Sequence, residues 1–431
     1  MKYPRSLAVR VLTQVLSEHR PLDEVLAVET KVLDPEVVAW LYEITAGTLR
    51  WKGRLDWVLD SVAARKKPSG WLRKILLLSA YQLIVQDRAP VAFVVSETVD
   101  EVKKMEGEAP SKFANACLRK IASQAQEWRT WTYPENKDPM TPQSAAWASL
   151  PSWFWNKLVH QRGLEWAKGF AGASLERPQL WIRARDLQQK LEGFDSLVPG
   201  GVPGSWTPSQ ASGGGISERT GFAEGEWIVQ DVSSQFLIAQ VSGKIRELRG
   251  EGSLTALDLC AAPGGKSVGL CWSGFRVSST DIRPDRVLLL QDTIARAAPE
   301  IEYLPWEQVM GSSPSPKHHW DLVWVDAPCS GSGIVRRHPD VRWLRQEKEI
   351  AVLVQQQKKL IREAWDRVAP GGFLAYSVCS IFSDEGERVV VDFVKDLASH
   401  AQEKPTLVQE WLLGPHLSSQ GDGFWGALLR K

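Results

Sequence analysis

The sequence predicts two kinds of domain in one chain: an all-α domain in the N-terminal third and an α/β domain with a parallel sheet in the C-terminal half. From residue 1 to about 130, apolar residues recur at helical spacing in one segment after another. From Glu226 onward, short β-rich runs alternate with helical patterns, and this alternation is typical of βαβ units. A chain of 431 residues is also too long for one ordinary core.

The first domain is expected to span residues 1–135. Pro68-Ser69-Gly70 and Ala89-Pro90 separate some of its helices. The segments with helical periodicity are RSLAVRVLTQVLSE, VVAWLYEITAGTLRW, LDWVLDSVAARK, WLRKILLLSAYQLIVQ, AFVVSETVDEVKKM and KFANACLRKIASQAQEW. Residues 136–150 belong to a stretch rich in Pro, Ser, Thr and Asn and are interpreted as a linker.

Residues 151–225 are expected to form a small α/β appendage that leads into the catalytic domain, with a helix, the strand QLWIRA and an irregular Gly/Pro/Ser segment. The catalytic domain is expected at 226–431. Its expected β-rich runs include WIVQDVSSQFLIAQV, LTALDLCAAPGG, FRVSSTDI, IEYLPW, DLVWVDAPC and GGFLAYSVCS. A helix is expected at about 347–368, another near Asp384, and a last strand in GDGFWGALLRK.

Composition excludes several classes of protein. Lys and Arg number 52 against 51 Asp and Glu, so no global basic field indicates a nucleic-acid partner, and any such surface must be local. The five cysteines form no CxxC pair, so we expect neither a zinc site nor a disulfide framework. No stretch approaches a membrane span. We therefore expect a cytoplasmic protein without metal or membrane partner, and a monomer.

A glycine turn follows the expected strand at Leu254–Leu259 in LTALDLCAAPGGKS. Glycines let a backbone approach a ligand closely, and a helix N-terminus favours an anionic group. The next strand ends at Asp281, where an acid would accept ribose hydroxyl hydrogens. A plain structural turn and a helix N-cap are the alternatives for the two features. Together they favour a nucleoside-bearing cofactor.

Two cysteines each follow an apolar run: Cys329 in LVWVDAPCSGSG and Cys379 in GGFLAYSVCSIFS. Most strand-end cysteines are buried small hydrophobes, and that interpretation is kept for Cys117, Cys260 and Cys271. Two thiols beside small residues and a cofactor turn instead point to methylation of carbon 5 of a pyrimidine. That carbon is a poor nucleophile until a thiolate adds to carbon 6.

At these residues the chain resembles the Sun-type family of RNA cytosine-5 methyltransferases, and within it the enzymes of small-subunit rRNA. The blocks that carry the resemblance are LDLCAAPGGKS, DAPCSGSGIVRRHPD, YSVCS, GDGF and WIVQDVSSQ. RSLAVRVLTQVL, LRWKGRLDWVLD, ILLLSAYQLI and SKFANACLRKI resemble the NusB-like RNA-binding domain of such enzymes. The resemblance covers nearly the whole chain and implies an all-α NusB-like domain followed by a Rossmann-like S-adenosylmethionine-dependent methyltransferase domain.

The resemblance also implies roles for particular residues. Asp281 holds the ribose of S-adenosylmethionine, and Asp326 lies between cofactor and cytosine and contacts both. Cys379 attacks carbon 6, and Cys329 helps to release the product. The cofactor turn comprises Cys260, Ala261, Ala262, Pro263, Gly264, Gly265 and Lys266.

Two arginines lie between the thiols, in GIVRRHPDVRW. Arg336 and Arg337 are candidates for holding RNA phosphates, with a solvated basic turn as the alternative.

The chain departs from the family pattern at four places. Glu307 stands where the family has an Asp after the third strand, and this longer carboxylate could still reach the adenine amino group. Val378 replaces the Thr before the nucleophile, and Gly386 replaces an Asn in the following block. The strand WIRA has Arg183-Ala184-Arg185 instead of the family's Arg-Asn pairing.

The leading hypothesis is therefore an S-adenosylmethionine-dependent enzyme that makes 5-methylcytosine in 16S rRNA. The target base must be unstacked, which favours a single-stranded loop or a partly assembled rRNA. The same reaction on tRNA is one alternative. A non-catalytic RNA-binding or ribosome-assembly factor is the other, and the two retained thiols argue against it.

Overall fold

The computed structural model of the protein describes residues 4–63, 66–86, 89–135, 138–186, 191–192, 194, 196–209, 215–311, 319–400, 405–417 and 421–431. The chain divides into two compact units. The first comprises Met1–Arg177 and Ile334–Glu347, and the second comprises Pro178–Gly333 and Lys348–Lys431.

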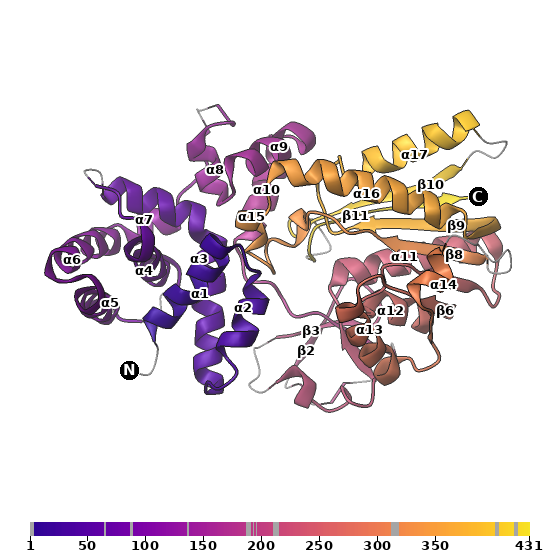
Figure 1. The fold of residues 1–431 in the computed structure, drawn as a ribbon, viewed down its shortest axis with the longest axis horizontal. Helices are drawn as coiled ribbons and strands as arrows, with labels where there is room; N and C mark the ends of the chain where they lie inside the picture. Colours follow the sequence, from indigo (N-terminus) through magenta and orange to yellow (C-terminus); the bar gives the residue numbers. More distant parts are fainter. Residues whose placement is uncertain are drawn as a thin grey trace. The chain divides into compact units, whose positions relative to one another are not determined.

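The first unit is helical, as the sequence predicted (Figure 1). Its described helices are α1 (Arg5–Glu18), α2 (Leu22–Glu29), α3 (Pro35–Val62), α4 (Gly70–Tyr81), the π-helical η1 (Gln82–Gln86), α5 (Val91–Glu106), α6 (Glu108–Ser123), α7 (Ala125–Arg129), α8 (Pro142–Ala148), α9 (Ser152–Arg162), α10 (Leu164–Ser174) and α15 (Val341–Leu344).

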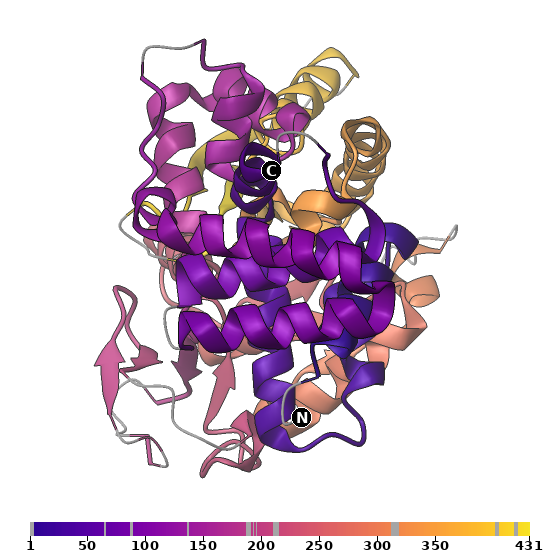
Figure 2. The ribbon, with the colours of Figure 1, turned by 90° about the vertical axis from the view of Figure 1, so that its left-hand side faces the viewer.

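The core of the first unit forms where the apolar stripes of these helices meet. Leu12 of α1, Leu49 of α3 and Leu76 of α4 are fully buried in one cluster. Helices α5 and α6 bury Val94 and Leu118 in the same cluster, and Figure 2 shows these two helices running side by side. Burial of these stripes stabilises the unit, because each fully buried aliphatic side chain contributes about 1.5–3 kcal/mol.

The interpretation of residues 136–150 as a linker is partly wrong, because this segment contains helix α8. Residues 136 and 137 lie outside the described residues. Thr141 caps the helix by accepting a hydrogen bond from the Ser144 backbone N–H, and Pro142 occupies the first helical turn. Trp147 buries its ring against Tyr133, which fixes the segment to the helical unit. The Thr and Pro residues that suggested a linker therefore mark the beginning of helix α8.

Helices α9 and α10, which the sequence assigned to the appendage 151–225, also belong to the first unit. The described residues from Pro178 to Gly225 belong to the second unit, while 187–190, 193, 195 and 210–214 lie outside the described residues.

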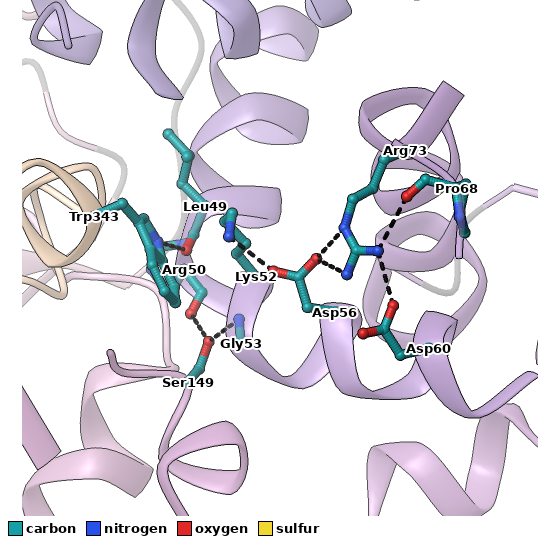
Figure 3. Close-up of polar contacts among 10 residues, drawn as sticks. All are labelled: Leu49, Arg50, Lys52, Gly53, Asp56, Asp60, Pro68, Arg73, Ser149 and Trp343. Atoms are coloured by element: carbon teal, nitrogen blue, oxygen red, sulfur yellow. Dashed lines mark hydrogen bonds and ion pairs between the residues drawn. The ribbon is translucent and has the colours of Figure 1, made fainter. Parts of the chain in front are cut away.

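A short segment from the C-terminal half of the sequence, Ile334–Glu347, also packs in the first unit. Its Trp343 Nε1 donates a 2.7 Å hydrogen bond to the Leu49 carbonyl (Figure 3). The Lys52 ammonium lies 4.3 Å from the centre of the Trp343 ring. Contacts between residues nearly 300 positions apart are invisible to local sequence patterns.

The second unit contains two sheets. A small antiparallel sheet has the strand order β2-β3-β1-β4. Its strands are β1 (Ile182–Ala184), β2 (Leu197–Pro199), β3 (Ser205–Pro208) and β4 (Trp227–Val229). The short 3-10 helix η2 (Ile216–Glu218) lies between β3 and β4 in the chain.

The large sheet has the strand order β10-β11-β9-β8-β5-β6-β7. Strands β7, β6, β5, β8 and β9 pair in parallel, whereas β11 pairs antiparallel with both β9 and β10. The strands are β5 (Thr255–Asp258), β6 (Arg276–Ser279), β7 (Glu302–Tyr303), β8 (Trp320–Asp326), β9 (Val368–Val378), β10 (Thr406–Leu413) and β11 (Phe424–Arg430).

Helices cover both faces of this sheet (Figure 1). On one face lie α11 (Val232–Arg249), α12 (Gly265–Trp272) and α13 (Pro284–Ala297), and on the other lie α16 (Glu347–Trp365) and α17 (Glu387–His400). The short α14 (Trp306–Met310) follows β7. The 3-10 helix η3 (Ser332–Ile334) follows the loop after β8 that contains Cys329. Among the described residues, no helix has the length and apolar content needed to cross a membrane.

Two details of the sheet differ from the sequence-based expectation. The run WIVQDVSSQFLIAQV is a strand only at Trp227–Val229, because Asp231 caps helix α11 by accepting a hydrogen bond from the Ser233 N–H. The sheet is mixed, since the C-terminal hairpin adds two antiparallel strands to the parallel ones. The expected strand in GDGFWGALLRK and the expected helix from Glu347 are confirmed.

Candidate functional site

The parallel strands place the candidate residues at one edge of the large sheet. Strands β5, β6, β8 and β9 run in the same direction, so their carboxyl ends lie together. The turn after β5, Asp281 after β6, Asp326 at the end of β8 and Cys379 after β9 all follow from this topology. The structure thus brings together residues that are up to 120 positions apart in the sequence.

The turn after β5 is held by Asp281. Its Oδ2 accepts a 3.1 Å hydrogen bond from the Ala262 N–H, and its Oδ1 accepts one of 3.0 Å from the Arg283 N–H. Gly264 adopts a φ of 108°, which a residue with a side chain rarely adopts. Asp281 is not the N-cap of α13, because that position is Arg283. The carboxylate shapes the turn and keeps lone pairs for a further donor.

Asp258, the last residue of β5, is a buried carboxyl behind the same turn. Its Oδ2 accepts a 2.7 Å hydrogen bond from Ser267, whose hydroxyl accepts one from Ser279. Its Oδ1 is buried and has no hydrogen-bond partner among the described residues. Burial raises the pKa of Asp258 to about 7, although the bond from Ser267 and the charge of Lys266 oppose the shift. Asp258 Oδ1 is therefore suited to accept a hydrogen bond from a ligand.

Lys266 and Asp326 form an ion pair between the turn and β8. The Lys266 Nζ lies 2.6 Å from Asp326 Oδ2, and Asp326 Oδ1 accepts a 2.8 Å hydrogen bond from the Ser377 hydroxyl. Burial is the largest single influence and lowers the pKa of Lys266, but the charge and hydrogen bond of Asp326, together with the charge of Asp258, outweigh it and raise the pKa. The Cys379 thiol also raises the pKa of Lys266. A permanent ammonium therefore interacts with both the carboxylate and the second thiol.

The two thiols are in contact. Cys329 Sγ lies 3.2 Å from Cys379 Sγ, and both side chains are half-buried. The hydrogen bond to Cys379, followed by burial, raises the pKa of Cys329 well above its ordinary value. Cys329 therefore holds its proton more tightly than an ordinary thiol. In contrast, Cys117 is buried in the helical unit, and Cys271 bonds to Glu300, so neither joins this pair.

A buried carboxylate, Glu385, holds both thiol loops. Its Oε1 accepts a 2.7 Å hydrogen bond from the Ser330 N–H, and its Oε2 accepts bonds of 2.5 and 2.6 Å from the hydroxyls of Ser330 and Ser380. Gln357 donates to Oε1 at 3.2 Å and to the Pro328 carbonyl at 2.9 Å. Ser330 and Ser380 directly follow the two cysteines. Glu385 therefore fixes the spacing of the thiols.

The departures from the family pattern have structural reasons. A Cβ at Gly386 would lie 2.8 Å from Cδ2 of the buried Trp425 ring, so a larger residue does not fit there. Val378 is fully buried in the apolar core of the sheet. Arg183 is half-buried and donates to the Gly269 carbonyl, so it supports helix α12 from the side of the small sheet.

Three candidate residues remain: Glu307, Arg336 and Arg337. Glu307 is exposed in the first turn of α14 and makes no side-chain hydrogen bond among the described residues. Arg336 and Arg337 belong to the segment that packs in the first unit. The Arg336 side chain is buried, and its carbonyl accepts a hydrogen bond from Arg50 Nε; Arg337 is half-buried. Their roles toward adenine and phosphate stay predictions.

Sequence reasoning missed Asp258, Ser377 and Glu385. Each pairs with a partner far away in the chain, and a single acidic or hydroxyl residue has no local signature. A weak signal existed for Glu385, since each thiol is directly followed by a serine that needs an acceptor. The acceptor itself could not be named before the fold was known.

The hydrogen-bonding groups at this edge of the sheet fit an S-adenosylmethionine molecule. Asp281 offers acceptor lone pairs, Asp258 Oδ1 is an acceptor without a donor, and the glycine turn leads into the N-terminus of α12. Among the described residues, no group of three or more His, Cys, Asp or Glu side chains could hold a metal ion.

The chain is similar in sequence to known proteins. A family model described as 16S rRNA methyltransferase RsmB/F matches residues 247–429, and a NusB family model matches residues 2–123. A protein of Klebsiella pneumoniae (strain 342) named ribosomal RNA small subunit methyltransferase B is 30% identical over 444 residues, which cover 99% of this chain and 98% of that protein.

Solved structures show the same fold. The crystal structure of PH0851 matches with a TM-score of 0.71 at 21% identity, over 99% of both chains. The structure of NSun6 from Pyrococcus horikoshii with SFG matches with a TM-score of 0.53 at 16% identity and covers 64% of this chain and 97% of that chain.

Proposed function

Because this chain belongs to the RsmB/F family of 16S rRNA methyltransferases, with a NusB-family N-terminal region, we propose that it methylates carbon 5 of a cytosine in small-subunit rRNA through a covalent bond to Cys379. Family membership assigns S-adenosylmethionine-dependent rRNA methylation. The base, the carbon atom and the covalent step are our proposal.

The contact between the two thiols carries this proposal. Methylation at carbon 5 needs one sulfur that adds to the ring and a second group that assists the later elimination. Cys329 and Cys379 lie 3.2 Å apart, and the pKa of Cys329 is raised by its bond to Cys379 and by burial. Cys329 therefore keeps its proton, and Cys379, near the Lys266 ammonium, is the sulfur available for attack.

The chemistry can be followed bond by bond. The Cys379 thiolate forms an S–C6 bond, and the electron pair of the C5–C6 double bond shifts toward the ring carbonyl and N3. The resulting nucleophilic carbon 5 would take the methyl group of the sulfonium, whose S–CH3 bond breaks and leaves a neutral thioether. A water molecule acting as base then takes the carbon-5 proton; the electron pair of the C5–H bond restores the C5–C6 double bond, and the S–C6 bond breaks to release the Cys379 thiolate. The protonated Cys329 assists this release by donating a hydrogen bond to the leaving Cys379 sulfur.

Asp326 and Lys266 are proposed to interact with the cytosine ring. Asp326 lies at the end of β8, with Ser377 and Lys266 fixing both of its oxygens. Its carboxylate orients the cytosine by accepting a hydrogen bond from the amino group. The Lys266 charge stabilises the electron density that develops on the ring during addition.

S-adenosylmethionine supplies an electrophilic methyl group on a sulfonium. Asp281 is proposed to accept hydrogen bonds from its ribose, and the turn Cys260–Lys266 to pass along its backbone. Glu307 is proposed to approach the adenine from α14.

The deciding experiment is incubation of the protein with methyl-labelled S-adenosylmethionine and protein-free small-subunit rRNA, with bulk tRNA in parallel, followed by nucleoside analysis. Label in 5-methylcytosine of rRNA alone supports the proposal. Label only in tRNA would retain the chemistry and replace the substrate. Label in another nucleoside would refute the carbon-5 assignment, and cofactor binding without any product would favour the non-catalytic RNA-binding factor.

A further inference from the structure

A cavity of about 550 Å³ lies within the helical first unit. Helix α3 contributes Arg50, Trp51 and Arg54, helix α4 contributes Tyr81, and the chain after α10 contributes Glu176 and Arg177. All of these residues belong to one unit, so the cavity does not depend on how the two units are placed. Three arginines against one acid give its walls a positive balance.

Two of the arginines are buried and incompletely bonded. Arg50 and Arg54 are 4% and 7% exposed. Arg50 Nε donates to the Arg336 carbonyl at 3.1 Å, and Arg54 Nε donates to the Trp147 carbonyl at 2.6 Å. Their Nη groups have no hydrogen-bond or ion-pair partner among the described residues. These Nη atoms are not sealed from solvent, so they can donate to a ligand that enters the cavity.

The orientation of Arg54 is fixed by aromatic rings rather than by acids. Its guanidinium carbon lies 5.1 Å from the centre of the Trp51 ring and 5.2 Å from that of Trp147. Burial lowers the pKa of Arg54 to about 10, and no carboxylate offsets the shift. The group still carries its charge at neutral pH, so a cation is held in the cavity wall without a counter-ion.

A nearby acid, Glu43, offsets part of this positive charge, because it opposes the lowering of the Arg50 pKa that burial causes. Glu43 accepts a hydrogen bond from the Tyr81 hydroxyl at 2.8 Å and forms an ion pair with Arg177. A third buried arginine, Arg342, donates to the Ser149 and Ser174 carbonyls and adds further positive charge beside Arg50 and Arg54. The local excess of positive charge favours an anion.

We propose that this cavity is a phosphate site for the rRNA backbone, in which the Nη groups of Arg50 and Arg54 donate to the oxygens of one phosphodiester. A guanidinium fork matches two phosphate oxygens at once. Arg177, whose side chain is 57% exposed, lies at the edge of the cavity where the RNA would enter. It adds a second contact to the RNA backbone. The inference rests on the proposed function in one respect, namely that the substrate is rRNA.

The test is equilibrium binding of the full chain to a fluorescent single-stranded rRNA fragment, without S-adenosylmethionine, over a series of salt concentrations. We expect Arg54→Gln to weaken binding about 10-fold and to reduce the salt slope by roughly 0.7–1. Arg177→Gln should weaken binding severalfold. The matched control is Arg119→Gln, because Arg119 is exposed on α6 and, among the residues that the structure describes, its side chain bonds to Asn115 alone. Affinities and slopes equal to those of the control would overturn the proposal.

Two further measurements keep the outcome clear. If Arg54→Gln does not fold, as judged by thermal unfolding, Arg177→Gln decides alone, since its exposed side chain contributes little to folding. Inorganic phosphate is added as a separate probe. Stabilisation by phosphate that Arg54→Gln abolishes, combined with unchanged RNA binding, would assign the cavity to a free anion and refute an RNA site. Failure of the proposed function would appear differently, as intact RNA binding without 5-methylcytosine.

Discussion

The Sγ atoms of Cys329 and Cys379 lie 3.2 Å apart, although 50 residues separate them in the chain. The two loops that carry them follow adjacent parallel strands, β8 and β9, and share the carboxylate of Glu385. This arrangement makes the thiols one unit rather than two independent groups. Replacing either of them should therefore stop the reaction at a different step.

Cys379→Ala should lower methylation by at least roughly 10³-fold, because no sulfur remains to add to carbon 6. Cys329→Ala should instead accumulate a protein–RNA adduct, because addition occurs and elimination fails. Adducts are counted by denaturing gel electrophoresis with labelled rRNA. Cys117→Ala, a buried cysteine of the helical unit, serves as the control and should form no adduct. Normal turnover by Cys329→Ala would eliminate the two-thiol scheme.

Glu385→Gln should reduce kcat about 10-fold while the KM for rRNA changes little. The amide places a donor against the Ser330 and Ser380 donors, which loosens the spacing of the thiols. The pH profile of kcat should shift as well. A variant that is merely less stable would keep the wild-type pH profile. Asp392→Asn on the surface of α17 is the control. A profile identical to the wild type would remove Glu385 from this positioning role.

Asp258→Asn should change how stability depends on pH. The pKa of Asp258 rises from 3.8 to about 7 on folding, so the folded state holds the extra proton between these values. The wild-type free energy of unfolding should therefore fall as pH rises from 5 toward 7, by up to about 1.4 kcal/mol per pH unit, and level off above. In the variant this contribution is absent. Urea unfolding of both proteins at pH 5, 6, 7 and 8 checks this, and parallel curves would contradict it.

Arg342→Met should destabilise the helical unit by about 3 kcal/mol. Arg342 is fully buried and donates to the carbonyls of Ser149 and Ser174, which would lose their donors in the variant. Hydrogen exchange of the α8 and α10 amides should accelerate most. The exposed Arg345→Met provides the matched comparison in the same segment. Equal exchange in the two variants would show that this segment does not hold the helices.

Much of the fold was predictable from local pattern. Helical periodicity indicated the N-terminal unit, and strand–helix alternation indicated the parallel sheet, because both depend on residues near each other in sequence. The site was also partly visible. A glycine turn, two strand-end cysteines and the acids Asp281 and Asp326 each carry a local signature. Their common location followed from a single rule, since parallel strands end at one edge.

Only the tertiary structure decided which groups touch. The amino-acid sequence by itself determined the residue types and the strand ends on which they stand. It did not determine that Glu385 joins the thiol loops, that Lys266 pairs with Asp326, or that Ile334–Glu347 packs among the N-terminal helices. Hydrogen bonds and ion pairs act over about 3 Å in space, whatever the separation along the chain. Contacts between distant residues therefore appear only when the backbone has folded.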